Sequence, residues 1–497
     1  MWRLSLGPVL VLTLSVGAWA EEAASPDADD QDGEGGQGGV EVEDGDEGGE
    51  EGAGASYILE QIEITGNRRT SDRVILREIA YRPGEVLDLD DQRIERSRYR
   101  LLATGFFSDV RLRLRRGSDR GRVVLVVEVV ERWTLIVREV FLGVTDITPY
   151  GGIDVEELNF LGHGISLSGS FVVADEQQGY RLQVAVPRFL DSVVSLSLGF
   201  LYNDARDFLG RYPVLVSGYG DEEMSYAPVN YTRIGGSVGV GLRVAHSTNI
   251  YLDYRLELIR AGVPFAAAQL GLPLGPEIGE PLEFHLLDGQ SLLSAFVLSL
   301  DHDTRDHPFL PSRGRHVAGS AMVSSDVIGS NYHFVKITVQ ADFYLRAPWR
   351  HSFRIGLLVG MIFGEAPLFE HYFVGDLSDQ IATRVLDLNF SHSPAPNIFR
   401  NSIAEMRYEK LCGRLDVEYI VPLYRGRRVV YGLDFFLLLG LYSLGSSEDF
   451  VSPPAGYSGG AFPIDLTLDM GFRLDTTAGV FGFSFQNLLG LIPFSED

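Results

Sequence analysis

The chain is poor in cysteine and, beyond its start, lacks long apolar runs. Its 497 residues include one cysteine, Cys412, which excludes an intramolecular disulfide and a cysteine-based zinc cluster. No uncharged run of about 18 apolar residues follows the first twenty residues, so we expect no membrane-spanning helix. The apolar share of the composition is nevertheless 45%. The apolar side chains must therefore belong to elements other than long helices.

Motifs for catalysis, cofactors or nucleic acid are also scarce. There is no phosphate-binding loop and no basic, aromatic surface for nucleic acid. The stretch "GYSGG" at 456–460 fits G-x-S-x-G, but it follows a proline-rich segment instead of a strand, so a nucleophile elbow is not expected. In "DHDTRDH" the alternation places Asp301 and Asp303 on one face and His302 on the other, which disfavours a metal cluster. We therefore expect no catalytic residue, no cofactor and no metal site.

The first twenty residues have the pattern of a secretory signal peptide. Arg3 precedes an apolar run from 4 to 16, and Ala18-Trp19-Ala20 is a small-x-small cleavage pattern. A retained N-terminal anchor is the alternative, and the absence of a basic flank disfavours it. We expect residues 1–20 to be removed on export.

Residues 21–56 form an acidic segment that is rich in glycine. It contains no lysine or arginine and carries about half of the formal charge of −26, which makes the acidity a property of this segment. Too little apolar surface is available there to offset the loss of chain entropy on folding. We expect a solvated linker; collection of calcium ions is the alternative role.

Residues 57–133 differ in pattern from everything that follows. Two segments of helical period lie between strand-like segments, and "DVRLRLRR" and "GRVVLVVEVVER" alternate around the turn "GSDRG". The expected order is strand, helix, helix, strand, strand. This is a small α+β domain.

From residue 134 to the end at 497, the apolar side chains recur at every second position. "FVKITVQADF" is typical, because one face carries only apolar residues and the other carries Lys336, Thr338, Gln340 and Asp342. In a soluble sandwich the polar face would meet water; in an outer-membrane barrel it would line the lumen and the apolar face would meet lipid. The polar faces mix opposite charges with glycine and serine, which favours the barrel.

The spacing of these segments fits a closed transmembrane antiparallel barrel. About 360 residues, at roughly 10 per strand plus the turns and loops between strands, give about 14 to 18 antiparallel strands. Short connections such as "RAPWRH" alternate with long ones, including "DEEMSYAPVNY", 266–289 and 364–403, as in outer-membrane barrels. Aromatic girdles at the two membrane interfaces are expected from residues near strand ends: Tyr231, Tyr332, Tyr344, Trp349 and Tyr424.

Several motifs carry a resemblance to a known family. The domain at 57–133, with "ITGNRRTSDRVILREI" and "LLATGFFSDV", resembles a polypeptide-transport-associated (POTRA) domain, an unrelated α+β domain being the alternative. The later part resembles the outer-membrane assembly factor family, the BamA/TamA group, also called the bacterial surface antigen family. The stretches that carry this are "VEELNFLGHGISLSGSF", "VPRFLDSVVSLSLGFLYNDARDF", "EHYFVGD" with "GRLDVEYIVPLY", and a "D-x-x-D-R…P…G" hairpin whose residues here are Asp301, Asp303, Arg305, Pro311 and Gly314.

The resemblance implies a contact between an external loop and the barrel lumen. In the family an arginine at the loop tip inserts between wall residues that include acidic ones. The matching residues here are Arg384 in "ATRVLDL" and Glu418 in "DVEYIVP", although Val385 and Leu386 replace the glycine and aromatic of the family motif. An ordinary loop arginine is the alternative interpretation of Arg384.

A second departure concerns the number of strands. "GVFGFSFQNLLGLIPF" aligns with the penultimate strand of the family, and only "SED" follows. Either the barrel has about sixteen strands and our count is one short, or it has one strand fewer.

The resemblance also implies a place and a role. We expect an outer-membrane barrel with its POTRA domain in the periplasm, which assists unfolded outer-membrane or secreted polypeptides and receives them by β-augmentation. The implied partners are outer-membrane lipid, such polypeptides, and periplasmic or lipoprotein accessory factors. A passive pore or a structural surface barrel without assembly activity is the alternative.

Overall fold

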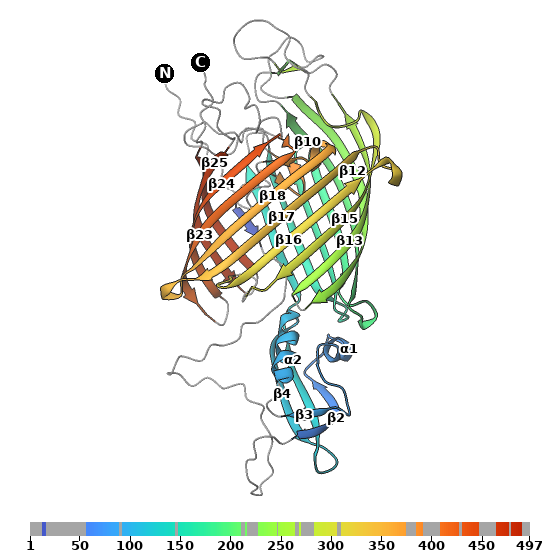
Figure 1. Ribbon diagram of the computed structural model, residues 1–497, viewed down its shortest axis with the longest axis vertical. Helices are drawn as coiled ribbons and strands as arrows, with labels where there is room; N and C mark the ends of the chain where they lie inside the picture. The colour runs from blue at the N-terminus through green and yellow to red at the C-terminus, as the bar shows by residue number, and fades with distance from the viewer. Residues whose placement is uncertain are drawn as a thin grey trace.

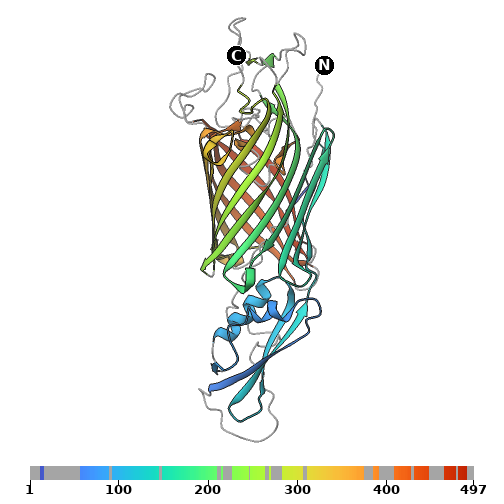
Figure 2. The ribbon, with the colours of Figure 1, turned by 90° about the vertical axis from the view of Figure 1, so that its right-hand side faces the viewer.

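Two units make up the molecule: a large barrel and a small domain at one of its ends (Figures 1 and 2). The computed structural model describes residues 12–15, 56–88, 92–144, 148–209, 214–215, 227–245, 247–263, 268–269, 283–305, 310–373, 384–390, 408–426, 430–446, 464–476 and 479–489.

The small domain is a four-stranded sheet with two helices. Its elements are β2 (Ser56–Thr65), α1 (Asp72–Leu76), β3 (Val86–Asp88), α2 (Gln92–Ala103), β4 (Phe107–Arg116) and β5 (Arg122–Glu131). The strand order is β3-β2-β5-β4, with β2 and β5 parallel and the other pairs antiparallel. The expected order is confirmed with one addition: after the turn at Gly84 the chain runs extended as β3 and pairs with the first residues of β2.

The core of this domain lies between the helices and the sheet. Val74 and Ile75 of α1 and Leu101 of α2 are at most 3% exposed, and they pack with Leu59 and Val127 of the sheet, both 0% exposed. Burying each such side chain contributes about 1.5–3 kcal/mol. No helix in the described ranges is long and apolar enough to cross a membrane.

The barrel is one antiparallel sheet of sixteen strands. Apart from β1 (Leu12–Ser15), each strand pairs with the barrel strand next to it in sequence: β6 (Leu135–Val144), β7 (Pro149–Phe160), β8 (Ile165–Ala174), β9 (Gln177–Val186), β10 (Val194–Leu209), β12 (Ala227–Ala245), β13 (Thr248–Gly262), β15 (Gly289–Asp303), β16 (Gly314–Ser324), β17 (His333–Arg346), β18 (Ser352–Glu365), β23 (Leu411–Arg425), β24 (Val430–Gly445), β25 (Ile464–Thr476) and β26 (Gly479–Leu489). The predicted barrel is thus confirmed.

The two ends of the sheet meet at β1. This strand pairs antiparallel with β6 and also lies beside β26, which closes the barrel. Of the sixteen strands, β1 alone precedes the small domain, so fifteen follow it within the described residues. Removal of residues 1–20 and the existence of a further strand after β26 stay predictions.

The two faces of the barrel strands differ as the alternation predicts. On β17, Val339 and Phe343 are 40% and 41% exposed on the outside. The polar residues of the same strand make contacts inside: Lys336 and Thr338 bond a segment in the lumen, and Asp342 bonds β18. An outer surface of exposed apolar side chains is stable only when hydrocarbon covers it.

Connection lengths differ between the two ends of the barrel. At the end next to the small domain, connections are short, such as the "RAPWRH" turn with η3 (Pro348–Arg350). At the other end long connections occupy 210–226, 263–288, 366–410 and 446–463. The predicted asymmetry is confirmed. The prediction of an aromatic girdle is wrong for three residues. Tyr231 and Tyr332 point inward and bond Asp207 and Ser291. Tyr344 lies on the same inward face of β17 as Asp342.

Candidate functional site

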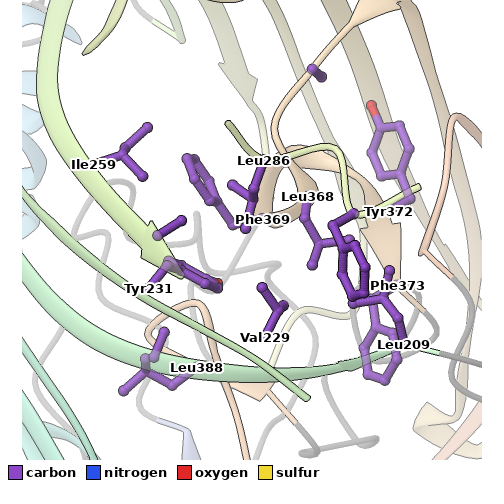
Figure 3. Close-up of a cluster of buried hydrophobic side chains, with 14 of the residues drawn as sticks. Leu209, Val229, Tyr231, Ile259, Leu286, Leu368, Phe369, Tyr372, Phe373 and Leu388 are labelled. Atoms are coloured by element: carbon purple, nitrogen blue, oxygen red, sulfur yellow. The ribbon is translucent and has the colours of Figure 1, made fainter. Parts of the chain in front are cut away.

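The long connection between β18 and β23 returns into the barrel. Its described elements are η4 (Leu368–Glu370), β19 (Tyr372–Phe373), β20 (Arg384–Val385), β21 (Leu388–Asn389) and β22 (Tyr408–Glu409). β20 pairs with β21, and β19 pairs with β22. We call these elements the lumenal segment. Figure 3 shows several of its side chains facing the inner wall.

An apolar cluster joins the lumenal segment to the wall. Leu368, Phe373 and Leu388 are at most 2% exposed and pack in one cluster with wall residues such as Tyr231 and Ile259 (Figure 3). The rings of Phe390 and Tyr150 also stack, with centroids 4.5 Å apart. Such packing removes apolar surface of the loop and of the wall from water inside the lumen.

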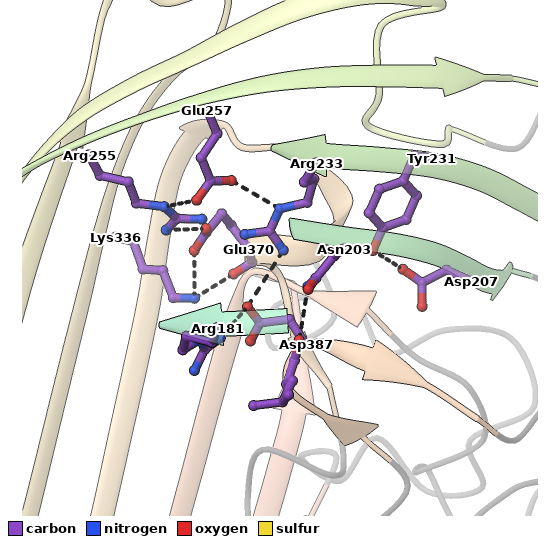
Figure 4. A network of polar contacts seen from close by, with 11 residues as sticks. Arg181, Asn203, Asp207, Tyr231, Arg233, Arg255, Glu257, Lys336, Glu370 and Asp387 are labelled. Carbon is purple, nitrogen blue, oxygen red and sulfur yellow. Dashed lines mark hydrogen bonds and ion pairs between the residues drawn. The ribbon is translucent and has the colours of Figure 1, made fainter. Parts of the chain in front are cut away.

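The tip of the β20–β21 hairpin is held by polar contacts. Leu386 and Asp387 both have left-handed backbone conformations, with φ of 50° and 65°, which cost energy in residues other than glycine. Asn203 donates a hydrogen bond of 2.9 Å to the carbonyl oxygen of Leu386. Asp387 lies 3.2 Å from Arg181 and 3.5 Å from Arg233 on the wall (Figure 4). These contacts stabilise the strained turn.

Arg233 is a charge that water hardly reaches. Its side chain is 1% exposed, and it donates to Glu257 at 3.0 Å and lies 3.9 Å above the ring of Phe369. Glu257 also contacts Arg255 of the same strand. A buried guanidinium must be paired to be tolerated, so the wall provides one acid and the loop tip the other.

Glu370 of η4 makes a second contact of this kind. Its carboxylate lies 2.7 Å from Arg255 and 3.2 Å from Lys336, and its carbonyl oxygen accepts a bond of 2.7 Å from Lys336 (Figure 4). The lumenal segment therefore presents acids, Asp387 and Glu370, to cations on four wall strands. This is the opposite charge arrangement to the one that the family motif implies.

A separate cluster lies on the wall nearer the small domain. Arg354 donates to Asp342, Asp416 and Glu418 at 2.9, 2.7 and 2.8 Å, and Arg473 also bonds Glu418. These bonds join β17, β18, β23 and β25 across the lumen side of the sheet. Glu418, 0% exposed, thus has its partners on the wall.

The expected contact between Arg384 and Glu418 stays a prediction. The backbone of Arg384 lies in β20, but its side chain is outside the described residues. Sequence reasoning missed Asp387, three positions further, and its wall partners Arg181 and Arg233. The signal was present, because both arginines lie on polar faces of strands that are otherwise apolar every second residue.

The family hairpin forms the short connection between β15 and β16. Arg305 donates to Asp303 at 2.9 Å, and Asp301 lies 2.8 Å from a histidine ring on β16. Gly314 has φ of 103°, and a Cβ there would lie 2.2 Å from a facing carbonyl oxygen, so only glycine fits. Pro311 lies in the same connection. These residues hold the hairpin; no cluster able to hold a metal occurs among the described residues. The "GYSGG" stretch is outside them.

The small domain is fixed to the barrel through the "NFLGHG" turn between β7 and β8. Ser71 donates its backbone N–H to the carbonyl oxygen of Gly162 at 2.9 Å. The side chain of Asn159 donates to Thr70 at 2.9 Å and accepts from the N–H of Gly164 at 2.7 Å. A Cβ on Gly162 would lie 1.8 Å from a carbonyl oxygen of the small domain, so the two backbones touch.

Glu131, the last residue of β5, supports this junction from the small domain. Its carboxylate accepts backbone N–H bonds from Thr70 at 2.6 Å and Arg69 at 3.0 Å. Burial raises the pKa of Glu131, but these backbone donors outweigh burial and lower the pKa below its usual value. Leu158 of β7 also packs against the core of the small domain. The junction is therefore a set of specific contacts.

These features define a class: an outer-membrane β-barrel with a segment folded into its lumen and a periplasmic POTRA domain fixed beneath it. Residues 159–379 match the Omp85 superfamily domain, and residues 57–132 match the POTRA family described as surface antigen variable number repeat. The chain thus carries a POTRA domain followed by an Omp85 superfamily domain.

Curated relatives are distant and longer. A putative outer membrane protein assembly factor from Treponema pallidum is 24% identical over 339 residues, which are 61% of this chain and 38% of that protein. Outer membrane protein assembly factor BamA from Buchnera aphidicola is 26% identical over 187 residues, 37% of this chain and 30% of that protein. The chain thus spans about a third of the length of these relatives.

Two solved structures share the fold. BamA from Haemophilus ducreyi lacking POTRA domains 1–3 superposes with a TM-score of 0.55 at 15% identity, covering 88% of this chain and 83% of that one. CdiB from Escherichia coli gives a TM-score of 0.54 at 13% identity, covering 88% and 73%.

Proposed function

We propose that this chain assists the insertion of β-barrel proteins into the outer membrane, or the passage of polypeptides across it. The observation that carries the proposal is the fixed junction at Gly162, which aligns a strand-edge domain with the barrel. A domain that only tethered the barrel would need no such alignment. Relatives named as outer membrane protein assembly factors add support.

The POTRA sheet offers a strand edge for an unfolded chain. β3 pairs with β2 at Ser56–Ile58, and the outer edge of β2 from 60 to 65 has no ladder partner among the described residues. An extended peptide can add to such an edge through main-chain hydrogen bonds, which accept many sequences. The proposed substrates are unfolded outer-membrane or secreted polypeptides, with periplasmic or lipoprotein accessory factors as further partners.

The contacts of the lumenal segment with the wall argue against the passive-pore alternative. The apolar cluster around Phe373 and Leu388 places packed, dry side chains in the lumen, where a passive pore would need water. The buried ion pairs of Arg233 and Glu370 also hold the lumenal segment in place. We further propose that the protein acts without catalytic chemistry, the substrate's own folding supplying the driving force.

Depletion in cells tests the proposal. The chain is depleted, and the abundance of other barrel proteins in isolated outer membranes is measured. We expect their abundance to fall, and to recover with the full chain but not with a chain lacking residues 57–133. A chain carrying Arg111→Gln, at a side chain 63% exposed on β4, is the control and should restore abundance. Unchanged abundance after depletion would count against an assembly role.

A further inference from the structure

Three arginines share one carboxylate where the POTRA domain meets the barrel. Glu78, 5% exposed, follows α1, and its carboxylate lies 3.4 Å from Arg77, 3.3 Å from Arg100 of α2 and 3.3 Å from Arg188. Arg188 belongs to the barrel, in the connection between β9 and β10. We call Arg77, Arg100 and Arg188 the arginine cluster. Both domains contribute to it.

The cluster has a surplus of positive charge. Among the side chains that the structure describes here, one carboxylate faces three guanidinium groups, which leaves two positive charges unbalanced in a partly buried place. The pKa of Arg188 is lowered, first by burial and then, against the attraction of Glu78, by Arg243, Arg100 and Arg77. Binding of a further anion would relieve the repulsion among these guanidinium groups.

Donors remain for such an anion. Each guanidinium has five N–H groups. Arg100 and Arg188 direct N–H groups to Glu78 and to the carbonyl oxygen of Arg77, at 3.4 and 3.2 Å. Their side chains are still 25% and 19% exposed, so a ligand can approach from outside.

Exposed apolar side chains lie directly beside the cluster. Phe189, Leu190 and Val193 follow Arg188 in the same connection and are 41%, 74% and 59% exposed. Leu190 has φ of 52°, a strained conformation for a bulky residue. The connection lies at the end of the barrel that carries the POTRA domain (Figure 2). In an outer membrane, the headgroups of the inner leaflet lie at this end of a barrel. Cations beside exposed apolar side chains at this depth suit a phospholipid.

We propose that the arginine cluster binds the phosphate of an anionic lipid headgroup in the inner leaflet, with an acyl chain against Leu190 and Val193. The bound lipid would link the POTRA domain to the membrane as well as to the barrel. This site does not depend on the assembly role, and it can exist in a barrel that assembles nothing.

Lipid retention measured by native mass spectrometry tests the site. The full chain is released from nanodiscs that contain equal amounts of phosphatidylglycerol and phosphatidylethanolamine, and the anionic lipid retained per protein is compared. Arg100→Gln, which leaves the bridge from Arg188 to Glu78 intact, should reduce retention about fivefold, the loss expected for one charge-assisted hydrogen bond. Arg188→Gln should do the same, and Arg111→Gln should change nothing.

Glu78→Gln separates a lipid site from a purely structural bridge. Removing the competing carboxylate should raise retention of phosphatidylglycerol if the arginines bind lipid, and leave it unchanged if they only hold the domains together. Inorganic phosphate added during release identifies the source of the anion. Retention that persists in its presence supports a headgroup with its chains. Retention equal for both lipids, or binding of free phosphate without preference for anionic lipid, overturns the proposal.

Discussion

At the scale of single residues, the lumen is held by opposite charges that water barely reaches. Asp387 and Glu370 come from the lumenal segment, and Arg233, Arg255 and Lys336 come from the wall. Because the guanidinium of Arg233 is 1% exposed, loss of an acid nearby is not compensated by solvent. The position of the lumenal segment therefore depends on a few side chains.

Asp387→Asn should loosen the hairpin tip. The substitution keeps the shape of the side chain but removes its attraction to Arg181 and Arg233. Because the carboxylate is 42% exposed, we expect a loss of only about 1 kcal/mol, or roughly fivefold more frequent opening of the lumen. Conductance of single molecules in planar lipid bilayers measures the opening frequency.

Asp326→Asn is the matched control for that experiment. Asp326 lies in the turn between β16 and β17 on the same side of the barrel, and its side chain is 71% exposed. Its replacement should leave the conductance trace unchanged. Equal traces for Asp387→Asn and the unchanged chain would mean that the tip contact does not hold the segment.

Gly162→Ala should separate the POTRA domain from the barrel. Gly162 has φ of 76°, and its new Cβ would meet a carbonyl oxygen at 1.8 Å. Gly84→Ala is the control. Gly84 has φ of 95° and a Cβ there would meet nothing within 4 Å, so this substitution adds backbone strain of about 1 kcal/mol but no steric clash. Distances between spin labels on α2 and on β13 should broaden for the first variant only. Narrow distributions in both would contradict the role of the turn.

Some functional residues could be predicted from the sequence alone, and others could not. The "NFLGHG" and "D-x-x-D-R…P…G" turns could be located from their glycines, because Gly162 and Gly314 need positive φ. The loop tip could not, because Asp387 acts through Arg181 and Arg233, which lie more than 150 positions away, and no local pattern records such a pairing. The family motif directed attention to Arg384 instead.

At the scale of elements, alternation predicted the strands and the face that each residue occupies. Val339 and Phe343 of "FVKITVQADF" were expected on the apolar face and are 40% and 41% exposed on the outside. The pattern failed where strands are short: β3 and the paired pieces of the lumenal segment have two or three residues. Pairing with distant chain fixes such pieces, and their own sequence has no period to reveal them.

The outer part of the lumenal segment should respond to pH. His371 is 1% exposed, and neither of its ring nitrogens makes a hydrogen bond with any residue that the structure describes. Its pKa falls from an ordinary 6.5 to about 3, first through burial and then through His285, Lys410 and Lys336. Below pH 6.5 His371 takes up a proton when the lumenal segment has left the wall, but not while the segment is packed against it. The packed state therefore becomes less stable as the pH falls toward 3. At pH 5 the loss is about 2 kcal/mol, or roughly thirtyfold more opening.

Conductance at pH 7.5 and pH 5 measures this effect. His371→Leu should remove the pH dependence, because it keeps the apolar contacts and cannot be protonated. His333→Leu, at a side chain 57% exposed on β17, should retain it. A pH dependence that survives in His371→Leu would assign the response to another group.

At the scale of the whole molecule, the sequence predicted the two units but not how they meet. The acidic segment, the α+β domain and the run of alternating strands each have a distinct composition, which makes their boundaries visible. The junction depends on Asn159 of the barrel, whose partner Thr70 lies 89 positions away in the small domain and is visible only once both domains are folded. An assembly role requires this junction, because a substrate strand on β2 must be delivered to the barrel.

Reconstitution tests this central claim most directly. The full chain is placed in phospholipid vesicles with its POTRA domain facing the external buffer, and an unfolded outer-membrane barrel protein is added to that buffer. The rate at which the added protein becomes protease-resistant is then measured. The account predicts faster insertion with the full chain, and insertion at the rate of empty vesicles with Gly162→Ala or without residues 57–133. Equal rates for the full chain and for empty vesicles would contradict it.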